Sequence, residues 1–568
     1  MRASSLLVAA LLLPVLSLAQ SPAPVPPVPL PAVIDETVPP QSDNYLPGPD
    51  SQPHAGVAAG KVLTFKLTNS KIFPDTVRTI TVYVPAAYQG DKPACVYVGL
   101  DGLGFDAATV FDNLIAQHAM PVTIGIGVSP GVVESAQAAE NPRFDRSFEF
   151  DSRSDRLARF VIEEVMPAVE QQPAVDGRAL KLSGDPNDRA IGGGSTGAIA
   201  AFTVAWERPD AFRRVFSSIG TYVGMRGGEQ YYVLVRKTEP KPMRIFMQDG
   251  VHDEWPGGPE MGDWWMSNLT MNRALEFAGY DVRHVWGAGS HNGSQATQLF
   301  PEAMRWLWRD YPAPIRAQAP GNPVLQAILQ PGEEWQVVAE GCAAGLAANL
   351  QGQVFYPGTQ PSPCAAGADG EAFGFGADGI IRRGSSLGPD IRSLTVRNNG
   401  DVYAVSAHEL WLFRANGERV QLDQDLKGAS GVALSPDGLW LFVAQRLSRS
   451  GLSYRVRADG TVDARAPLYD FYVPAWADDS GAGGIGMDRD GRAYVATRAG
   501  VQVFDRNGRV AGILPLPGNA AASGLCFGGR DFDTLYVAGG GKVYRRKLRL
   551  QGAPPWAPVS KLPTWGAG

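Results

Sequence analysis

The chain has 568 residues and a formal net charge of −6 at pH 7. This length exceeds what one hydrophobic core supports, so two or three folding units are expected. Charges of both signs are interspersed, and no long basic run or basic-aromatic stripe occurs. The composition therefore argues against nucleic acid as a partner and offers no polybasic membrane-binding surface.

Residues 1–19 have the pattern of a secretory signal peptide. A charged residue precedes an apolar stretch from Leu6 to Leu16, and small residues follow it. Residues 20–59 are expected to form a linker, because the Pro-rich part from Ser21 to Pro40 cannot maintain a helix or a sheet ladder. No later run is long and apolar enough to span a bilayer. The sequence predicts a secreted or periplasmic protein.

Residues 60–312 alternate strand-like and helix-like runs, which indicates a mostly parallel α/β sheet. The apolar run at 94–100 is typical of a strand covered on both faces. Residues 156–171 repeat apolar positions at helical spacing. Two further strands are predicted at 243–248 and 282–286, each followed by a polar loop and a helix.

The segment IGGGSTGAIA, from Ile191 to Ala200, has the pattern of a nucleophile elbow. It contains G-x-S-x-G around Ser195, where a sharp strand-to-helix turn raises the serine hydroxyl above a sheet and glycines relieve the crowding. A strand-like run precedes the segment and a helical run follows it. This context favours an α/β-hydrolase domain with Ser195 as nucleophile over an ordinary Gly-rich turn.

A serine nucleophile needs a general base and a carboxylate that orients the base. His291 lies in the loop after the last predicted strand, the usual place for the base, whereas His284 falls inside that strand. For the acid, the loop DGVHDEW offers Asp249, Asp253 and Glu254. Asp253 is favoured because it lies further along the loop, from where it can reach His291.

An oxyanion hole requires two backbone N–H groups. In the elbow pattern one comes from the residue after the nucleophile, Thr196, and the other from an earlier strand-to-helix loop. The loop GLDGLGF at 99–105 directly follows the buried strand and is predicted to supply the second.

Four other side chains have two interpretations each. Trp264 and Trp265 either stack on a sugar or an aromatic acyl group or pack inside the protein. Arg143 and Arg146 either border the cleft or belong to the solvated surface.

Seven segments of 60–312 together resemble the esterase-D-like esterases of carbohydrate esterase family 1, whose relatives include feruloyl and acetylxylan esterases and mycolyltransferases. The resemblance implies a serine carboxylesterase that hydrolyses feruloyl, acetyl or similar esters of carbohydrates or small esters, without a cofactor. It implies Ser195 as nucleophile, Asp253 as acid and His291 as base, with the N–H groups of Leu103 and Thr196 as the oxyanion hole. The segments are VYVGLDG, RSFEFD, AIGGGSTGAIA, RIFMQDGVHDEW, WWMSNLTMNRALEFAGYDVRHVW, GSHNG and FPEAMRWLWRDYP.

The pattern changes after Pro312. Short alternating segments follow, with Asn-Gly or Asp-Gly dipeptides that suit the tight turns between antiparallel strands. Their recurrence predicts a β-propeller of about six blades over 326–550, with a β-sandwich as the alternative. Residues 313–325 would form a linker and 551–568 a tail. The dipeptides begin at Asn399, Asp437, Asp490 and Asn507.

Four cysteines are too few for a disulfide scaffold. Cys95 and Cys526 lie in apolar, strand-like runs and are expected to be buried thiols. Cys342 and Cys364 flank a loop-rich segment and are the candidate disulfide in an oxidising compartment.

The segments GVALSPDG, DDSGAGGIGMDRDGRAYVATRAGVQVFD and LCFGGRDFDTLYV resemble the gluconolactonase/regucalcin-type propeller. That resemblance implies a divalent ion held on the axis by Glu, Asn and Asp, the oxygen ligands that Ca²⁺ requires. Here Ala344, Arg392, Ser430 and Gly483 stand at the expected ligand positions, so a metal-free, non-catalytic propeller is predicted. Two alternatives remain: a metal-dependent gluconolactonase, and a carbohydrate-binding protein with no activity in either domain.

Overall fold

The computed structural model describes residues 44–136, 141–174, 176–253, 259–341, 345–355, 372–388 and 390–563. The predicted signal peptide, the Pro-rich stretch, Glu254, Cys342, Ala344 and Cys364 lie outside the described residues. Within these ranges, no helix is both long and apolar enough to cross a membrane.

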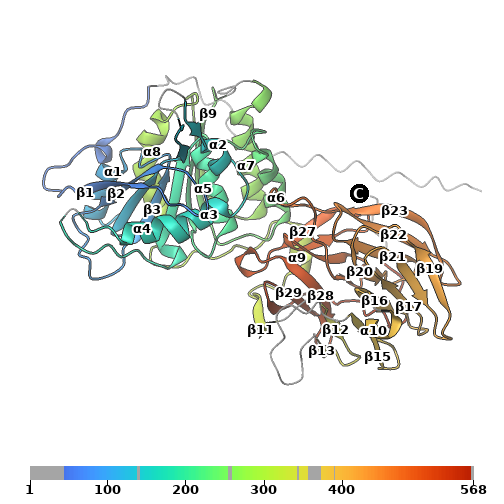
Figure 1. The fold of residues 1–568 in the computed structure, drawn as a ribbon. Helices are drawn as coiled ribbons and strands as arrows, with labels where there is room; N and C mark the ends of the chain where they lie inside the picture. The colour runs from blue at the N-terminus through green and yellow to red at the C-terminus, as the bar shows by residue number, and fades with distance from the viewer. Residues whose placement is uncertain are drawn as a thin grey trace, which may run out of the picture. The chain divides into compact units, whose positions relative to one another are not determined.

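One eight-stranded sheet forms the centre of the N-terminal half (Figure 1). Its order is β1-β2-β4-β3-β7-β8-β9-β10. The first two strands are antiparallel to their neighbours, and the remaining six run parallel. The predicted mostly parallel α/β sheet is confirmed. The strands are β1 (Lys61–Leu67), β2 (Arg78–Val84), β3 (Cys95–Leu100), β4 (Thr123–Val128), β7 (Arg189–Gly194), β8 (Arg214–Ser218), β9 (Arg244–Gly250) and β10 (Asp281–Gly287).

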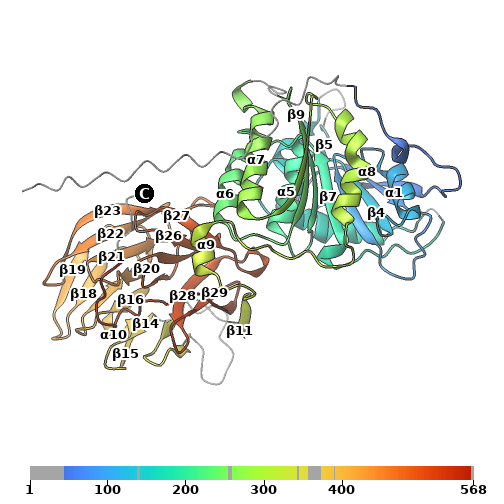
Figure 2. The ribbon, with the colours of Figure 1, turned by 180° about the vertical axis from the view of Figure 1, so that it is seen from behind.

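Helices cover both faces of this sheet. Figures 1 and 2 show α1 (Ala107–Ala116) and α8 (Ser294–Trp308) on the opposite side of the strands from α5 (Thr196–Glu207) and α7 (Trp264–Ala278). Because side chains alternate along a strand, β3 contributes to two separate cores. Val96 and Val98 pack on the α5 side, and Tyr97 packs on the α8 side.

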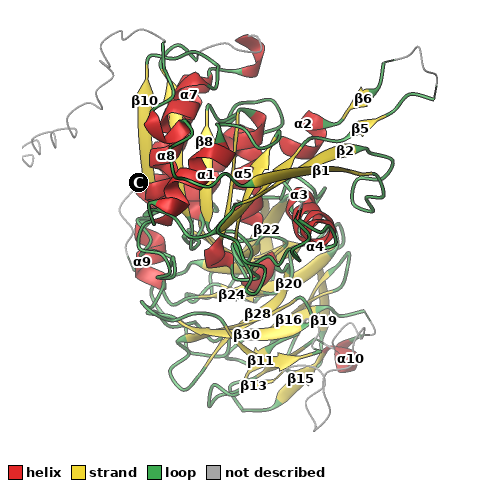
Figure 3. Cartoon of the chain, turned by 90° about the vertical axis from the view of Figure 1, so that its left-hand side faces the viewer, coloured by secondary structure: helices red, strands yellow, loops and turns green. Residues whose placement is uncertain are grey.

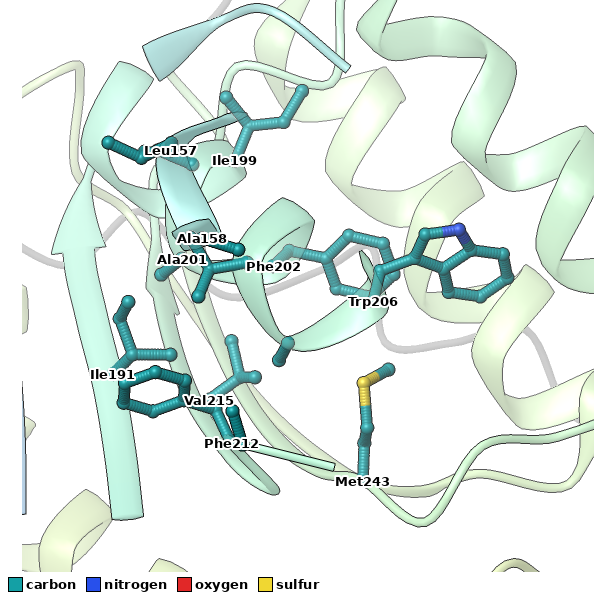
Figure 4. Close-up of a cluster of buried hydrophobic side chains, with 14 of the residues drawn as sticks. Leu157, Ala158, Ile191, Ile199, Ala201, Phe202, Trp206, Phe212, Val215 and Met243 are labelled. Atoms are coloured by element: carbon teal, nitrogen blue, oxygen red, sulfur yellow. The ribbon is translucent and has the colours of Figure 1, made fainter. Parts of the chain in front are cut away.

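The core beneath α5 holds that helix in place. Figure 4 shows Ile199, Phe202 and Trp206 of α5 beside Ile191 of β7 and Val215 of β8. These five side chains are buried, each with at most 6% of its surface exposed. Burial of such large apolar groups stabilises the helix by about 1.5–3 kcal/mol each. The first turn of α5, which follows Ser195, is thereby fixed to the sheet.

The helix predicted at 156–171 is present but is not regular. It consists of α3 (Arg156–Arg159), a π-helical segment η2 (Phe160–Val165) and α4 (Met166–Glu170). Pro167 has no N–H, and in a regular α-helix its ring would clash with the carbonyl four residues earlier. The wider π turn precedes this proline, a feature that apolar spacing alone does not reveal.

The described part of the predicted linker packs on the N-terminal half. Tyr45 accepts a hydrogen bond from the Ala288 N–H at 2.7 Å. Asn113 of α1 donates to the Asp50 carbonyl at 2.8 Å, and Arg305 of α8 pairs with the Asp50 carboxylate at 2.7 Å. Residues 45–50 are therefore part of the folded structure.

Strands and loops make up almost all of the C-terminal half (Figure 3). In the described residues it contains four four-stranded antiparallel sheets, and the expectation of about six blades is corrected to four. The N-terminal strand of this half, β11, pairs with its C-terminal strand, β30, as closure of a propeller requires. The sheets are β11 (Gln336–Glu340), β30 (Lys542–Lys547), β29 (Thr534–Gly539) and β28 (Ala522–Gly528); β16 (Ser393–Val396), β17 (Val402–Val405), β18 (Leu410–Phe413) and β19 (Arg419–Asp423); β20 (Ala429–Leu434), β21 (Trp440–Gln445), β22 (Ser450–Val456) and β23 (Val462–Asp470); and β24 (Ile485–Met487), β25 (Ala493–Thr497), β26 (Gly500–Phe504) and β27 (Val510–Leu514).

Two shorter sheets explain the difference in blade number. Strands β12 (Ala347–Ala348) and β13 (Val354–Phe355) form one, and β14 (Phe373–Phe375) and β15 (Ile381–Arg383) form the other. Strands of two or three residues offer few ladder hydrogen bonds, and glycines interrupt this part of the chain. The described residues there form two-stranded sheets and no full blade.

Candidate active site

Ser195 occupies the turn between β7 and α5. Its backbone has φ 56° and ψ −122°, a conformation that a residue with a side chain rarely adopts. A Cβ on Gly193 would lie 2.7 Å from the carbonyl carbon of Gly197, so the turn requires glycine at that position. The Ser195 N–H donates to the Ser218 carbonyl at 2.9 Å, which ties the strained turn to β8.

Three of the predicted residues are joined by hydrogen bonds. His291 Nε2 lies 2.8 Å from Ser195 Oγ, and His291 Nδ1 lies 2.9 Å from both carboxylate oxygens of Asp253. A carboxylate only accepts hydrogen bonds, so Nδ1 carries the proton and Nε2 can accept from the serine hydroxyl. The Asp253 side chain is fully buried, whereas the His291 side chain is 24% exposed.

Backbone hydrogen bonds lock the acid loop to the base loop. Val251 donates to the Gly287 carbonyl at 2.9 Å, and His252 donates to the Gly289 carbonyl at 3.0 Å. A Cβ on Gly250 would lie only 2.1 Å from the Gly289 carbonyl oxygen. The absence of a side chain there lets the two loops approach closely, which brings Asp253 and His291 together.

The competing acid, Asp249, lies at the end of β9 and is fully buried. Its Oδ1 accepts the Gly250 N–H at 2.7 Å, and its Oδ2 is buried without a hydrogen-bond donor in the described residues. Burial and next the charge of Asp253 raise the pKa of Asp249 well above its usual value. The imidazole of His291 is bonded to Asp253.

The two predicted oxyanion-hole residues lie at the same edge of the sheet. Thr196 is the first residue of α5, where backbone N–H groups have no intrahelical acceptor. Leu103 lies in the loop after β3, the parallel neighbour of β7. A Cβ on Gly127 of β4 would lie 2.4 Å from the Leu103 nitrogen. The loop thus folds tightly onto the ends of the strands.

Two further residues lie beside the nucleophile: Thr221, which the sequence pattern did not indicate, and Trp264, for which it left two interpretations open. The Thr221 hydroxyl lies 3.3 Å from Ser195 Oγ and accepts a hydrogen bond from Trp264 Nε1 at 3.2 Å. The Trp264 ring meets His291 edge-on, with 5.7 Å between ring centroids. Trp264 is 2% exposed and therefore packs inside the site. Its neighbour Trp265 packs edge-on against Trp286.

The two arginines that the sequence offered as candidates for the cleft border are both paired with carboxylates. Arg146 makes two hydrogen bonds of 2.7 Å to Asp101, which directly follows β3. Arg143 is largely exposed and pairs with Asp145 at 2.8 Å. Arg146 therefore braces the start of the loop that carries Leu103.

The expected ligand positions of the propeller pack closely against backbone. Ser430 donates its hydroxyl hydrogen to the Ala482 carbonyl. A Cβ on Gly483 would lie 2.0 Å from the Ser523 carbonyl oxygen, which leaves no space for an aspartate side chain. Across the described residues, no group of three or more His, Cys, Asp or Glu side chains has the arrangement of a metal site.

Two regions of the chain match known families. Residues 71–353 match the family described as "Putative esterase", and residues 394–540 match the SMP-30/Gluconolactonase/LRE-like region. The first match includes the bonded side chains of Ser195, Asp253 and His291, and it continues beyond α8 to β12.

Individual relatives are distant. A gluconolactonase of Zymomonas mobilis subsp. mobilis is 24% identical over 164 residues, which are 28% of this chain and 46% of that protein. The chain thus spans less than half the length of this curated relative.

Solved structures of both kinds resemble parts of the chain. A ferulic acid esterase is 17% identical, with 44% of this chain and 98% of that chain covered and a TM-score of 0.34. An enterobactin esterase from Shigella flexneri is 14% identical, with coverages of 45% and 61% and a TM-score of 0.35. A gluconolactonase from Xanthomonas campestris is 19% identical, with coverages of 40% and 93% and a TM-score of 0.31.

Proposed function

From the premise that the chain combines an esterase-family region with a gluconolactonase-like region, we propose that it is a serine carboxylesterase of the α/β-hydrolase fold. The observation that carries this proposal is the hydrogen-bonded series from Ser195 through His291 to Asp253, on the strained turn after β7. This series has the order of nucleophile, general base and orienting carboxylate that acyl transfer requires.

The reaction has two steps. His291 removes the hydroxyl proton as Ser195 Oγ attacks the acyl carbonyl, and the resulting imidazolium is stabilised by Asp253. The imidazolium then protonates the leaving alcohol oxygen as the acyl-enzyme forms. Water, deprotonated by His291, hydrolyses that ester and restores the serine.

Negative charge on the carbonyl oxygen needs donors that are already in place. The N–H groups of Thr196 and Leu103 are proposed to provide them, since both residues lie at the carboxyl edge of neighbouring parallel strands. A single donor of this kind contributes a factor of about 10²–10³ to kcat.

The proposed substrates are acyl esters of carbohydrates, such as feruloyl or acetyl esters, or related small esters. The support is the resemblance of 60–312 to carbohydrate esterase family 1. Because residues 1–19 have the pattern of a signal peptide, the proposed site of action is outside the cytoplasm.

The test is a panel of nitrophenyl acetate, longer-chain nitrophenyl esters, methyl ferulate and acetylated xylan. Wild-type protein should hydrolyse at least one of them, and Ser195→Ala should not, because the substitution deletes the nucleophile and little volume. Equal turnover by the two proteins would refute the proposal. If the wild-type protein hydrolyses none of these esters but binds a sugar, the result would support the alternative of an inactive carbohydrate-binding protein.

A second candidate function is lactone hydrolysis by the C-terminal half. The family match at 394–540 and the similarity to a gluconolactonase favour it. The close packing around Gly483 and Ser430 opposes it, because those positions offer no carboxylate. Hydrolysis of gluconolactone by the Ser195→Ala protein in the presence of Ca²⁺ or Zn²⁺ would establish a second active site.

A further inference from the structure

The proposed reaction leaves one carboxyl group at the site without a role. Asp249 is fully buried, and its Oδ2 has no hydrogen-bond donor among the described residues. In the described part of the chain, the one N–H group that donates to this side chain is that of Gly250, 2.7 Å from Oδ1. An ionised carboxylate in such a place would cost several kcal/mol, because no cationic side chain of the described residues compensates it.

Asp249 is also in contact with a second buried carboxyl group. After burial, the charge of Asp253 and an interaction between the two carboxyl groups are the next largest causes that raise the pKa of Asp249. Two ionised carboxylates cannot share a hydrogen bond, so one member of this pair carries a proton. The other charged group that acts on Asp249 is Asp263, which directly precedes α7 and is also acidic. His291 reaches the pair only through Asp253.

The surroundings decide which member is ionised. Both oxygens of Asp253 lie 2.9 Å from His291 Nδ1, so a positive charge that forms on the imidazole stabilises the Asp253 carboxylate. Where the structure describes its surroundings, Asp249 has a single donor, the neutral backbone N–H of Gly250. The proton therefore resides on Asp249, at the oxygen that lacks any donor.

We propose that Asp249 is a positioning residue that stays protonated and donates a hydrogen bond to Asp253. This inference rests on the proposed esterase function for its kinetic consequences. The bond holds the Asp253 carboxylate toward His291 and shares its negative charge. The pKa of Asp249, raised by burial and by the Asp253 charge, agrees with the protonated form at neutral pH.

The sign of the effect on His291 follows from this arrangement. Without the donor, the Asp253 charge is balanced by the imidazolium alone, which favours protonated His291. The acidic limb of the kcat/KM–pH profile, which reports the base of the free enzyme, should then move to higher pH. An amide at position 249 still donates a hydrogen bond and should leave the limb in place.

Two variants in the full-length protein separate the possibilities. Asp249→Asn should keep kcat/KM within about twofold and leave the acidic limb unmoved, because donor, charge and volume are kept. Asp249→Ala should lose about tenfold, the usual effect of removing one hydrogen bond to a charged group, and shift the limb upward. A downward shift in both variants would show that Asp249 is ionised and would overturn the proposal. An unmoved limb in Asp249→Ala would reduce its role to packing.

A spectroscopic measurement does not depend on activity. The infrared difference spectrum of wild type minus Asp249→Asn should contain the carbonyl band of a protonated carboxylic acid at neutral pH. The Ser195→Ala background should give the same band, because it leaves the pair intact. Absence of the band refutes the inference even if ester hydrolysis is observed. The band without any ester hydrolysis refutes the proposed function instead and leaves the protonated pair established.

Discussion

Substitutions at different residues of the site should affect different properties of the protein, and Asp253 should affect kcat. Asp253 lies within hydrogen-bond distance of His291 through both carboxylate oxygens and has no exposed surface. Asp253→Asn removes the charge that stabilises the imidazolium and favours the wrong tautomer of the histidine. We expect kcat to fall by on the order of 10⁴-fold with KM little changed.

The measurement is steady-state kinetics on the best nitrophenyl ester, with circular dichroism to verify folding. The matched control is Asp249→Asn, the same chemical change four residues earlier, at the end of β9. A larger loss for the control than for Asp253→Asn would transfer the orienting role to Asp249.

Thr221 offers a second prediction at this scale. Thr221→Val keeps the shape but removes the hydroxyl that accepts from Trp264 and touches Ser195 Oγ. The buried indole N–H then lacks its partner, so a loss of about 1–3 kcal/mol in the free energy of unfolding is expected. Activity should also fall, by about tenfold, while Thr221→Ser retains both properties. Urea denaturation and kcat measure the two effects, and an unchanged Thr221→Val protein would contradict the assigned contact.

The sequence located some of these residues and not others, for a physical reason. Ser195 and His291 follow strands that are recognisable in the sequence, so their loops could be placed at one edge of a sheet. The role of Thr221, the choice between the two interpretations of Trp264 and the proposed protonation of Asp249 depend on contacts between distant segments. Such bonds have no characteristic spacing along the chain.

Among the elements, the loop at 99–105 packs too closely on β4 to accept added volume there. Gly127→Ala on β4 would place a methyl group 2.4 Å from the Leu103 nitrogen and force this loop away from the strand ends. We expect kcat/KM to fall at least about tenfold through loss of an oxyanion donor.

The control lies in the same loop. A Cβ on Gly104 meets no heavy atom within 4 Å, so Gly104→Ala should stay within about twofold of wild type. Comparison of kcat/KM and the melting temperature for both variants provides the check. Equal activity of the two would remove Leu103 from the proposed hole.

At this scale the long buried strands of the N-terminal half were predictable, because β3, β7 and β9 are covered on both faces and read as apolar runs. The π-helical segment before Pro167 was not, since its apolar spacing is still helical. The short strands β12 to β15 were also missed, because two or three residues give no period to recognise.

For the whole molecule, the prediction concerns metal ions and the C-terminal half. A divalent ion replaces its hydration shell only with several oxygen ligands, usually including carboxylates. Ser430 and Gly483 provide no carboxylate, and the backbone of Ser523 fills the space beside Gly483. The melting temperature of the full-length Ser195→Ala protein should therefore not change with Ca²⁺, Zn²⁺ or chelator, because a ligand that does not bind cannot stabilise.

Calorimetric titration of the same protein with each ion tests this directly. Micromolar binding, together with turnover of gluconolactone, would show that other residues form a metal site. Binding without turnover would limit the metal to a structural role and would still contradict the prediction.

The bonded side chains come from three separate loops, and this has a consequence for how the protein acquires activity. Ser195 and His291 are 96 residues apart, and His291 and Asp253 are 38 residues apart. Parallel pairing of β7, β8, β9 and β10 must be complete before these side chains meet, and such non-local pairing forms late and slowly. A chain in which this sheet is still incomplete would carry all three residues and remain inert. Recovery of esterase activity during refolding would thus report assembly of the entire sheet.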